Sequence, residues 1–312
     1  MPSILGIVIG LALVGALMIP LERLWPSVRG QRLLRRGWKG DLVYWLFTPL
    51  VTRAVTRFVV GALLVIAVAI VAKGATVQSL MQGHGPIGQQ PRWLQAIELL
   101  LLMDLVGYWT HRWFHGGWRW RFHAIHHSPI ELDWLSSVRL HPVNDLLTRI
   151  AQVAVAVGLG FAPLVLAGAA PVLTLWAIFI HANVSWDLGP FRAVIASPRF
   201  HRWHHTSAEE GRDRNFAGLF PFWDILFGTY YMPRHAPTRF GVDDPVPEGL
   251  IGQLVWPFRS RRNEEAARGV GAQPDGERTN PPSFPPLPPV FRPPHGADIA
   301  RSQRTPGRAF HS

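Results

Sequence analysis

The feature that most constrains this chain is a set of histidines arranged in three clusters. Two clusters lie in the stretch from Asp104 to His127, DLVGYWTHRWFHGGWRWRFHAIHH, and the third lies in SPRFHRWHH. The clusters are His111 and His115; His123, His126 and His127; and His201, His204 and His205. Spacings of three and four residues place the members of a cluster on one face of a helix. A fold that uses all three clusters must bring distant helices together.

This spacing suits metal binding. Neutral imidazole is a good ligand for iron, zinc and copper, and a pair one helical turn apart can direct two ring nitrogens at one ion. Eight histidines in three clusters could hold two ions. The alternative is that the histidines line a wet helix face and bind nothing. Because three clusters occur within residues 111–205, we favour a metal site.

The rest of the chain has the composition of a membrane protein. Hydrophobic residues make up 48% of it, and they gather in long uncharged runs. Residues 1–21 carry no charged side chain and are long enough for a spanning helix. A signal peptide is the alternative, but no basic segment precedes this run and no small-residue cleavage site follows it. We therefore expect a retained membrane anchor.

The basic loop 29–39 sets the predicted topology. The positive-inside rule places this loop in the cytoplasm and the N-terminus outside. Nucleic-acid binding is disfavoured because the basic run is short and adjoins apolar segments. Residues 41–74 are expected to form an interfacial helix and one tilted span, followed by an outer loop over 73–92. Residues 93–109 then return to the cytoplasmic side, so the first two clusters lie on the side of the basic loop.

The second half of the chain predicts a helical hairpin and a tail. Residues 150–186 carry no Asp, Glu, Lys or Arg, which fits two crossings with a turn offered by Pro163, Gly168 and Pro171. The hairpin returns the chain near His181, beside the third cluster, so His181 is a candidate ligand. Ser197 and the proline after it predict a helix start. Residues 206–234 are expected to fold back over the metal-bearing helices.

Two further residues near the clusters are candidates for supporting roles. Asp104 lies seven residues before His111, which puts the two on one helix face, so Asp104 could orient a ligand histidine from the second shell. His141, in RLHPVND, could be a ligand, a second-shell residue or a helix cap. His84 is expected to be an exposed loop residue.

Several classes of site are excluded or disfavoured. The chain has no cysteine, which excludes disulfides, cysteine-ligated zinc, iron–sulfur clusters and thiolate haem. A histidine-rich membrane metal-binding or transport protein is the main alternative, but a transporter would place its ligands in mid-span, whereas these clusters lie beyond the apolar runs. A bis-histidine haem protein is disfavoured because it needs only a pair of axial histidines, whereas HxxHH occurs twice. A zinc protease is disfavoured because HExxH is absent.

The three clusters, in this order, resemble the histidine boxes of the fatty acid hydroxylase and sterol desaturase superfamily. The segments HANVSWDLGPF, SPRFHRWHH and DRNFAGLFPFWDILFGTYY resemble the branch that includes alkylglycerol monooxygenase. The resemblance covers about residues 99–233. It implies that the eight box histidines are iron ligands, that His181 matches a further family histidine, and that Ser185 stands where some members have another. It also matches Asp104 to an acidic position before the first box. Asn215 matches a family asparagine after the third box, which would support the ligands without binding the metal.

What the resemblance implies is an integral-membrane enzyme with two iron ions. Such enzymes use O₂ and external electrons to hydroxylate or desaturate a C–H bond of a lipid such as a sterol, fatty acyl or ether lipid. Because the chain has no redox module of its own, a separate donor is implied: a reductase, a ferredoxin or a cytochrome b5-like carrier, with a reduced pterin as the alternative. No nucleic-acid partner is expected.

The resulting architecture is all-α. We predict a polytopic membrane helical bundle of four or five spans with a cytoplasmic histidine-rich helical cap, in the inner or plasma membrane if the source is bacterial. Residues 1–92 would form N-terminal transmembrane helices and loops, and residues 93–258 a fatty acid hydroxylase-like catalytic domain. Residues 259–312, which include PPSFPPLPPVFRPP, would be a disordered Pro/Arg-rich tail.

Overall fold

The computed structural model describes residues 3–71 and 82–259; the predicted tail and most of the first half of the predicted outer loop fall outside these ranges. All regular elements within them are helical. Extended segments pair there only as two isolated bridges, Pro26 with Val184 and Thr206 with Phe240. The all-α prediction is therefore confirmed.

The N-terminal part is more continuously helical than expected. Helix α1 spans Ile4–Leu24, and the Ser3 hydroxyl caps it by accepting from the N–H of Gly6 at 3.0 Å. Helix α2, Trp38–Phe47, passes through one π-helical turn, Thr48–Thr52, directly into α3, Arg53–Val71. The two expected elements are therefore one continuous helical run, and an interfacial position for its first part stays a prediction. Pro49, which lacks an N–H, lies in the π turn and accounts for the local widening.

Among the described residues, three helical segments are long and apolar enough to cross a membrane. They are Ile4–Leu24, Trp38–Leu63 and Pro163–His181. The prediction of four or five spans also counted helices that carry charges: α6, Arg92–Phe114, contains Glu98 and Asp104, and α8 is Pro142–Leu159. The chain is a helical membrane protein, and the number of its crossings stays a prediction.

The hairpin is confirmed, but its turn lies earlier than expected. Helix α8 ends at Gly160, whose φ of 94° is left-handed and suits glycine. Pro163 starts α9, Pro163–His181, while Pro171 lies inside that helix. Helices α6, α8 and α9 pack around a shared apolar core that includes Leu99 and Phe161.

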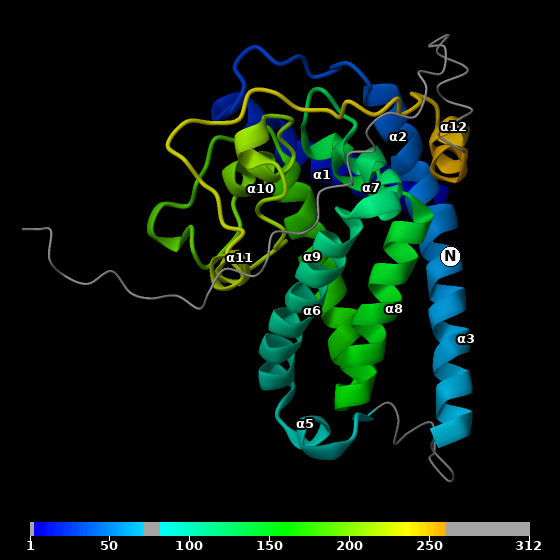
Figure 1. Cartoon of the computed structure of the whole chain (residues 1–312). Helices are drawn as coiled ribbons and strands as arrows, with labels where there is room; N and C mark the ends of the chain where they lie inside the picture. The colour runs from blue at the N-terminus through cyan, green and yellow to red at the C-terminus, as the bar shows by residue number, and fades with distance from the viewer. Residues whose placement is uncertain (1–2, 72–81, 260–312) are drawn as a thin grey trace, which may run out of the picture. The chain divides into compact units, whose positions relative to one another are not determined.

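The two ends of this bundle are different. At one end, the short helix α5, Gly85–Gln89, follows His84, whose backbone N–H donates to Gly160 at 3.0 Å. At the other end lie α7, Trp120–His127, and α10, Pro198–His204 (Figure 1). Ser197 caps α10 by accepting from the N–H of Phe200 at 3.1 Å, which confirms the predicted helix start. The short elements that complete this end are the 3-10 helices Gly117–Arg119, Trp134–Val138, Gly189–Phe191, Glu209–Gly211 and Trp256–Phe258, with α11, Phe222–Leu226, and α12, Leu250–Val255.

A buried ionic network ties the basic loop to the histidine end. Arg35 donates to Asp41 at 2.5 Å and to Asp133 at 2.7 Å, and Arg139 donates to Asp41 at 2.7 Å. All four side chains are buried. Arg35 is therefore a buried structural cation and not part of a solvated loop. It fixes residues 29–39 to the segment that follows the second histidine cluster.

We expect Asp41→Asn to destabilise the protein by about 3–5 kcal/mol, because it leaves two buried guanidinium groups without their shared counter-charge. Denaturant unfolding of the detergent-solubilised protein measures the loss. Glu248→Gln is the matched control: it removes the exposed pair with Arg36, at 3.5 Å, and should cost less than about 1 kcal/mol. Equal losses for the two variants would show that the buried network does not carry this stability.

Candidate metal centre

The structure brings nine histidines together in two groups, and these nine are the eight cluster histidines and His181. In each group, one nitrogen from every member lies within 4.8 Å of the others. Group 1 consists of His111, His115, His123, His127 and His204. Group 2 consists of His126, His181, His201 and His205. The histidine side chains are buried or half-buried throughout.

The HxxHH pattern divides each short helix between the two groups. On α7, His123 and His127 are four residues apart and face group 1, while His126 faces group 2. On α10 the assignment is reversed: the i, i+4 pair His201 and His205 faces group 2, and His204 faces group 1. Helix α6 and its cap residue add two members to group 1, and the end of α9 adds His181 to group 2. Each short helix therefore joins both groups, which fixes them side by side.

The tautomers in group 1 leave lone pairs pointing at one another. His111 Nδ1 donates to the carbonyl of Phe216 at 2.8 Å, and His123 Nδ1 donates to Asn144 Oδ1 at 2.7 Å. A neutral imidazole with its proton on Nδ1 carries a lone pair on Nε2. The two Nε2 atoms lie 2.9 Å apart. Two lone pairs at this distance repel, and a cation shared between them converts the repulsion into attraction.

Group 2 shows the same arrangement. His126 Nδ1 donates to the carbonyl of Arg139 at 3.0 Å, and His181 Nδ1 donates to that of Ala177 at 2.6 Å. The Nε2 of His181 then lies 3.1 Å from the Nε2 atoms of His126, His201 and His205. Four ring nitrogens thus converge on one point, as a metal site requires.

Two buried nitrogens of group 1 point to a missing partner. The Nε2 atoms of His115 and His204 are buried, and neither has a hydrogen-bond partner within the described chain. Their opposite nitrogens are both engaged: His115 Nδ1 donates to Asp213 at 2.9 Å, and His204 Nδ1 donates to the carbonyl of Arg214 at 2.8 Å. The residues present therefore fit a bound metal ion.

The protonation state also fits. Burial, followed by the neighbouring histidines, holds the pKa of six of these imidazoles well below the ordinary value of 6.5. These six are His123, His126, His127, His201, His204 and His205. They are neutral at pH 7, so their lone pairs are available without displacing a proton. Imidazole-rich sites of this kind suit iron, zinc and copper.

One segment, residues 213–216, orients three histidines of group 1. Its contacts come from the Asp213 carboxylate and from the carbonyls of Arg214 and Phe216. Between those carbonyls lies Asn215, in a left-handed conformation with φ 57°. Its side chain donates to the carbonyl of Tyr231 at 2.7 Å and accepts from the N–H of the same residue at 2.7 Å. Asn215 touches no histidine and acts by setting the direction of its neighbours' carbonyls.

Asp104 holds the backbone just after this segment. Its carboxylate accepts from the backbone N–H groups of Gly218, Leu219 and Phe220, at 3.0, 2.8 and 2.7 Å. The acceptor for His111 Nδ1 is a backbone carbonyl, so the expected direct contact from Asp104 is wrong. Asp224, which the sequence did not suggest, holds the N–H groups just before Gly218, and burial raises its pKa to about 6.

His141 lies in neither group. Its Nδ1 accepts from the N–H of Val143 at 3.1 Å, and its Nε2 donates to the carbonyl of Leu254 at 3.1 Å. Of the three roles left open by the sequence, the structure shows the helix cap, at the start of α8. A second residue that sequence reasoning missed is Asn144, three positions later, whose side chain accepts from His123. Only its place inside RLHPVND could have drawn attention to it.

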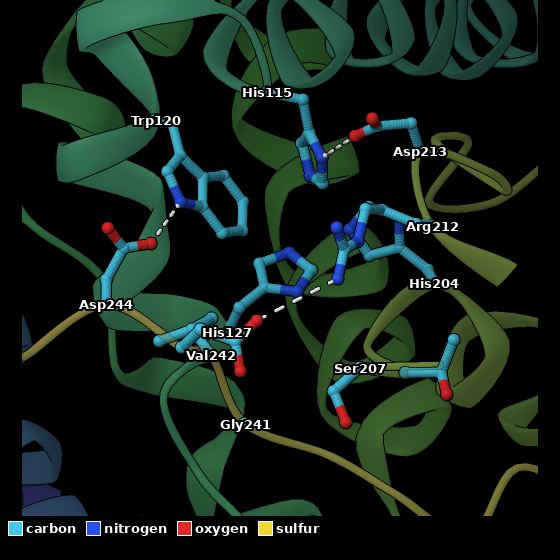
Figure 2. Close-up of a pocket in the computed structure, with 12 residues that line it drawn as sticks. His115, Trp120, His127, His204, Ser207, Arg212, Asp213, Gly241, Val242 and Asp244 are labelled. Atoms are coloured by element: carbon cyan, nitrogen blue, oxygen red, sulfur yellow. Dashed lines mark hydrogen bonds and ion pairs between the residues drawn. The ribbon is translucent and has the colours of Figure 1, made fainter. Parts of the chain in front are cut away.

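A polar cavity of about 180 Å³ reaches group 1. Figure 2 shows the rings of His115, His127 and His204 turned toward the same space, with Asp213 beside the first of them. Trp120 lines the cavity too, and its indole N–H donates to Asp244 at 2.8 Å. Group 1 is thus accessible from a cavity that carries carboxylates and an arginine.

Comparison with known proteins places this site in a family. The sequence model of the fatty acid hydroxylase family matches residues 96–229, a range that holds all nine histidines. Ornithine lipid hydroxylase OlsE of Rhizobium tropici is 30% identical over 258 residues, covering 80% of this chain and 72% of that protein. No solved structure matches.

Other relatives match a shorter part of the chain. Alkylglycerol monooxygenase of Homo sapiens is 30% identical over 145 residues, and the match covers 46% of this chain but 32% of the relative. Methylsterol monooxygenase 1-2 of Arabidopsis thaliana is 27% identical over 145 residues, covering 43% and 46% respectively. The chain spans about a third of the length of the alkylglycerol monooxygenases that it matches. By these matches, its helical membrane segments and its histidine groups, the chain belongs to the fatty acid hydroxylase superfamily and is an oxidoreductase.

Proposed function

We propose that this oxidoreductase is a non-haem di-iron oxygenase that hydroxylates, or desaturates, a C–H bond of a membrane lipid. Each histidine group would bind one iron. The observation that carries the proposal is the convergence of imidazole lone pairs at two adjacent points. The relatives support a lipid substrate, since their names give ornithine lipid, alkylglycerol and methylsterol as the molecules on which they act.

The protein's own contribution is to hold neutral ligands in fixed directions. Irons bound in this way would supply the activation of dioxygen and the cleavage of the C–H bond. Backbone carbonyls and Asn144 fix the tautomers of the histidines by accepting from Nδ1, which leaves Nε2 for the metal. Imidazole ligands add no negative charge of their own, so a bound metal would keep most of its positive charge.

The polar cavity beside group 1 is the proposed aqueous entrance. Its walls include Asp213, Asp243 and Asp244 next to His115, so water and protons can reach this side of the site without crossing the apolar bundle. Asp213 has two roles in this arrangement. It holds the His115 ring by accepting from Nδ1, and its half-exposed carboxylate lies on the path into the site.

Electrons are proposed to come from a separate donor. A reductase, a ferredoxin or a cytochrome b5-like carrier would serve, and a reduced pterin is the alternative. We place the histidine end on the cytoplasmic side of the membrane, because Arg35 joins the basic loop 29–39 to Asp133 at this end. Four or five spans, and the division into residues 1–92, 93–258 and 259–312, remain part of this proposal.

We expect His181→Ala to reduce bound iron from two ions toward one per chain, because it removes one of four ligands from group 2. The matched control is His141→Ala, which removes another buried histidine outside the three clusters. That control should keep both irons and lose about 1 kcal/mol of stability with its helix cap. Elemental analysis of the purified proteins, with a spectrum to confirm the lack of a Soret band, gives the result. A full iron complement in His181→Ala would remove this residue from the ligand set.

Cells that express the chain should accumulate a lipid absent from cells without it. Under ¹⁸O₂, a hydroxylated product carries the label from dioxygen, whereas a desaturated product carries none and has lost two hydrogens. His126→Ala should lower the product by about a hundredfold or more, because metal centres are sensitive even to the loss of outer-shell partners. His235→Ala, an exposed histidine outside both groups, should leave the product unchanged. Equal product from His126→Ala and the intact chain would refute the proposed centre.

A further inference from the structure

A second cavity lies between helices α3, α6, α8 and α9 and is chemically unlike the first. Its volume is about 350 Å³. One part of its wall is cationic and consists of Arg53, Arg57 and Arg149. The opposite part is apolar and comes mainly from α9, with Leu166 and Leu173 among its residues. None of the nine histidines lines it.

The charges on this wall do not balance. Asp145 is the one acidic residue lining the cavity against three arginines. Its carboxylate already accepts from the Thr56 hydroxyl at 3.0 Å and lies 3.7 Å from Arg149 Nε. Within residues 3–71 and 82–259, no hydrogen bond or ion pair joins the guanidinium group of Arg53 or Arg57 to another protein group. The cavity therefore has an uncompensated positive charge.

The apolar wall extends further toward the far end of the bundle than the arginines do. Arg53 starts α3, and Arg149 lies two turns after the start of α8, so both are in the half of the bundle that carries the histidines. The apolar wall follows α9 from Leu173 back to Pro163, which is next to the far-end turn at Gly160. A cationic end with an apolar wall leading away from it matches the distribution of charge in a lipid.

Uncompensated arginines beside apolar walls in a membrane protein are costly unless an anion accompanies them. Guanidinium groups bind carboxylate and phosphate with charge-assisted, often bidentate hydrogen bonds. The volume lies in the range of about 300–1,000 Å³ typical of ligand pockets, enough for a headgroup and the first part of a chain.

We propose that this cavity binds a lipid with an anionic headgroup, a phosphate or a carboxylate, with the headgroup on the three arginines and the chain along α9. Consecutive residues of α8 serve the two sites: Asp145 lines the cavity, and Asn144 before it accepts from His123. We assign the bound lipid as the substrate, a step that rests on the proposed function. A zwitterionic lipid lacks the net charge that this wall selects.

The test uses the full-length iron-loaded protein in phosphatidylcholine nanodiscs. Spin-labelled phosphatidic acid, spin-labelled stearic acid and spin-labelled phosphatidylcholine are added in separate arms, and electron paramagnetic resonance gives the immobilised fraction of each. Phosphatidic acid or stearate should bind more tightly than phosphatidylcholine. Whichever of the two binds more tightly identifies a phosphate or a carboxylate as the preferred group.

Variants then locate the binding to the cavity. Arg53→Gln and Arg149→Gln should each weaken binding of the anionic probe about tenfold, the loss expected for one charge-assisted hydrogen bond. Arg53→Lys, which keeps the charge, should restore most of the affinity. Arg57→Gln changes an exposed lining residue and serves if a partly buried variant does not fold. Arg23→Gln, an exposed arginine at the end of α1 outside the cavity, should change nothing.

The outcomes separate the two proposals. Equal binding of phosphatidylcholine, or full affinity in the Arg→Gln variants, overturns the cavity assignment even if the intact protein makes an oxidised lipid. Selective, arginine-dependent binding by a protein that makes no oxidised lipid supports the cavity and refutes the oxygenase. Iron content and elution volume, measured for every variant, show that a loss of binding is not a loss of folding.

Discussion

The main constraint on this structure is that it holds several imidazole lone pairs close enough to repel one another. The Nε2 atoms of His111 and His123 lie 2.9 Å apart, and those of His126 and His181 lie 3.1 Å apart. At these distances the lone pairs of neutral rings repel unless a cation lies between them. They are kept there because each Nδ1 is fixed by an acceptor on rigid backbone or on Asn144. The helices are therefore arranged to supply acceptors as well as imidazoles, and a bound metal would make the arrangement favourable.

The N-terminal helices belong to this arrangement. The backbone carbonyl of Arg139 accepts a hydrogen bond from His126 Nδ1, and the Arg139 side chain donates to Asp41 on α2. Asp41 in turn pairs with Arg35 of the basic loop, and Arg35 reaches Asp133. A chain of buried charge pairs thus runs from the first loop to an acceptor in the metal centre. Cutting it would disturb group 2 without touching a histidine.

The spacing of the histidines was enough to predict which residues converge, because helical periodicity alone places His123 with His127 and His201 with His205. His181 followed from the length of the preceding hairpin. The acceptors could not be predicted in this way. The sequence does not distinguish the carbonyl of Phe216 from any other backbone carbonyl. The direction of this carbonyl depends on the left-handed Asn215 and on Asp104, which is more than a hundred positions away in the chain. Proline and glycine also predict the hairpin turn too late, because Pro171 is accommodated inside the apolar helix α9 and the turn lies at Gly160.

The two histidine groups are not equivalent, and the difference follows from what surrounds them. Group 1 has five imidazoles, one of which bonds to the Asp213 carboxylate, and it borders a polar cavity. Group 2 has four buried imidazoles, and the Nδ1 atoms of His126 and His181 donate to backbone carbonyls. A carboxylate makes the ring that it holds a stronger electron donor to a metal, so a metal in group 1 would have the stronger ligand field and the better access to water. Water and protons would thus reach group 1, while group 2 lies in a drier environment made of imidazoles.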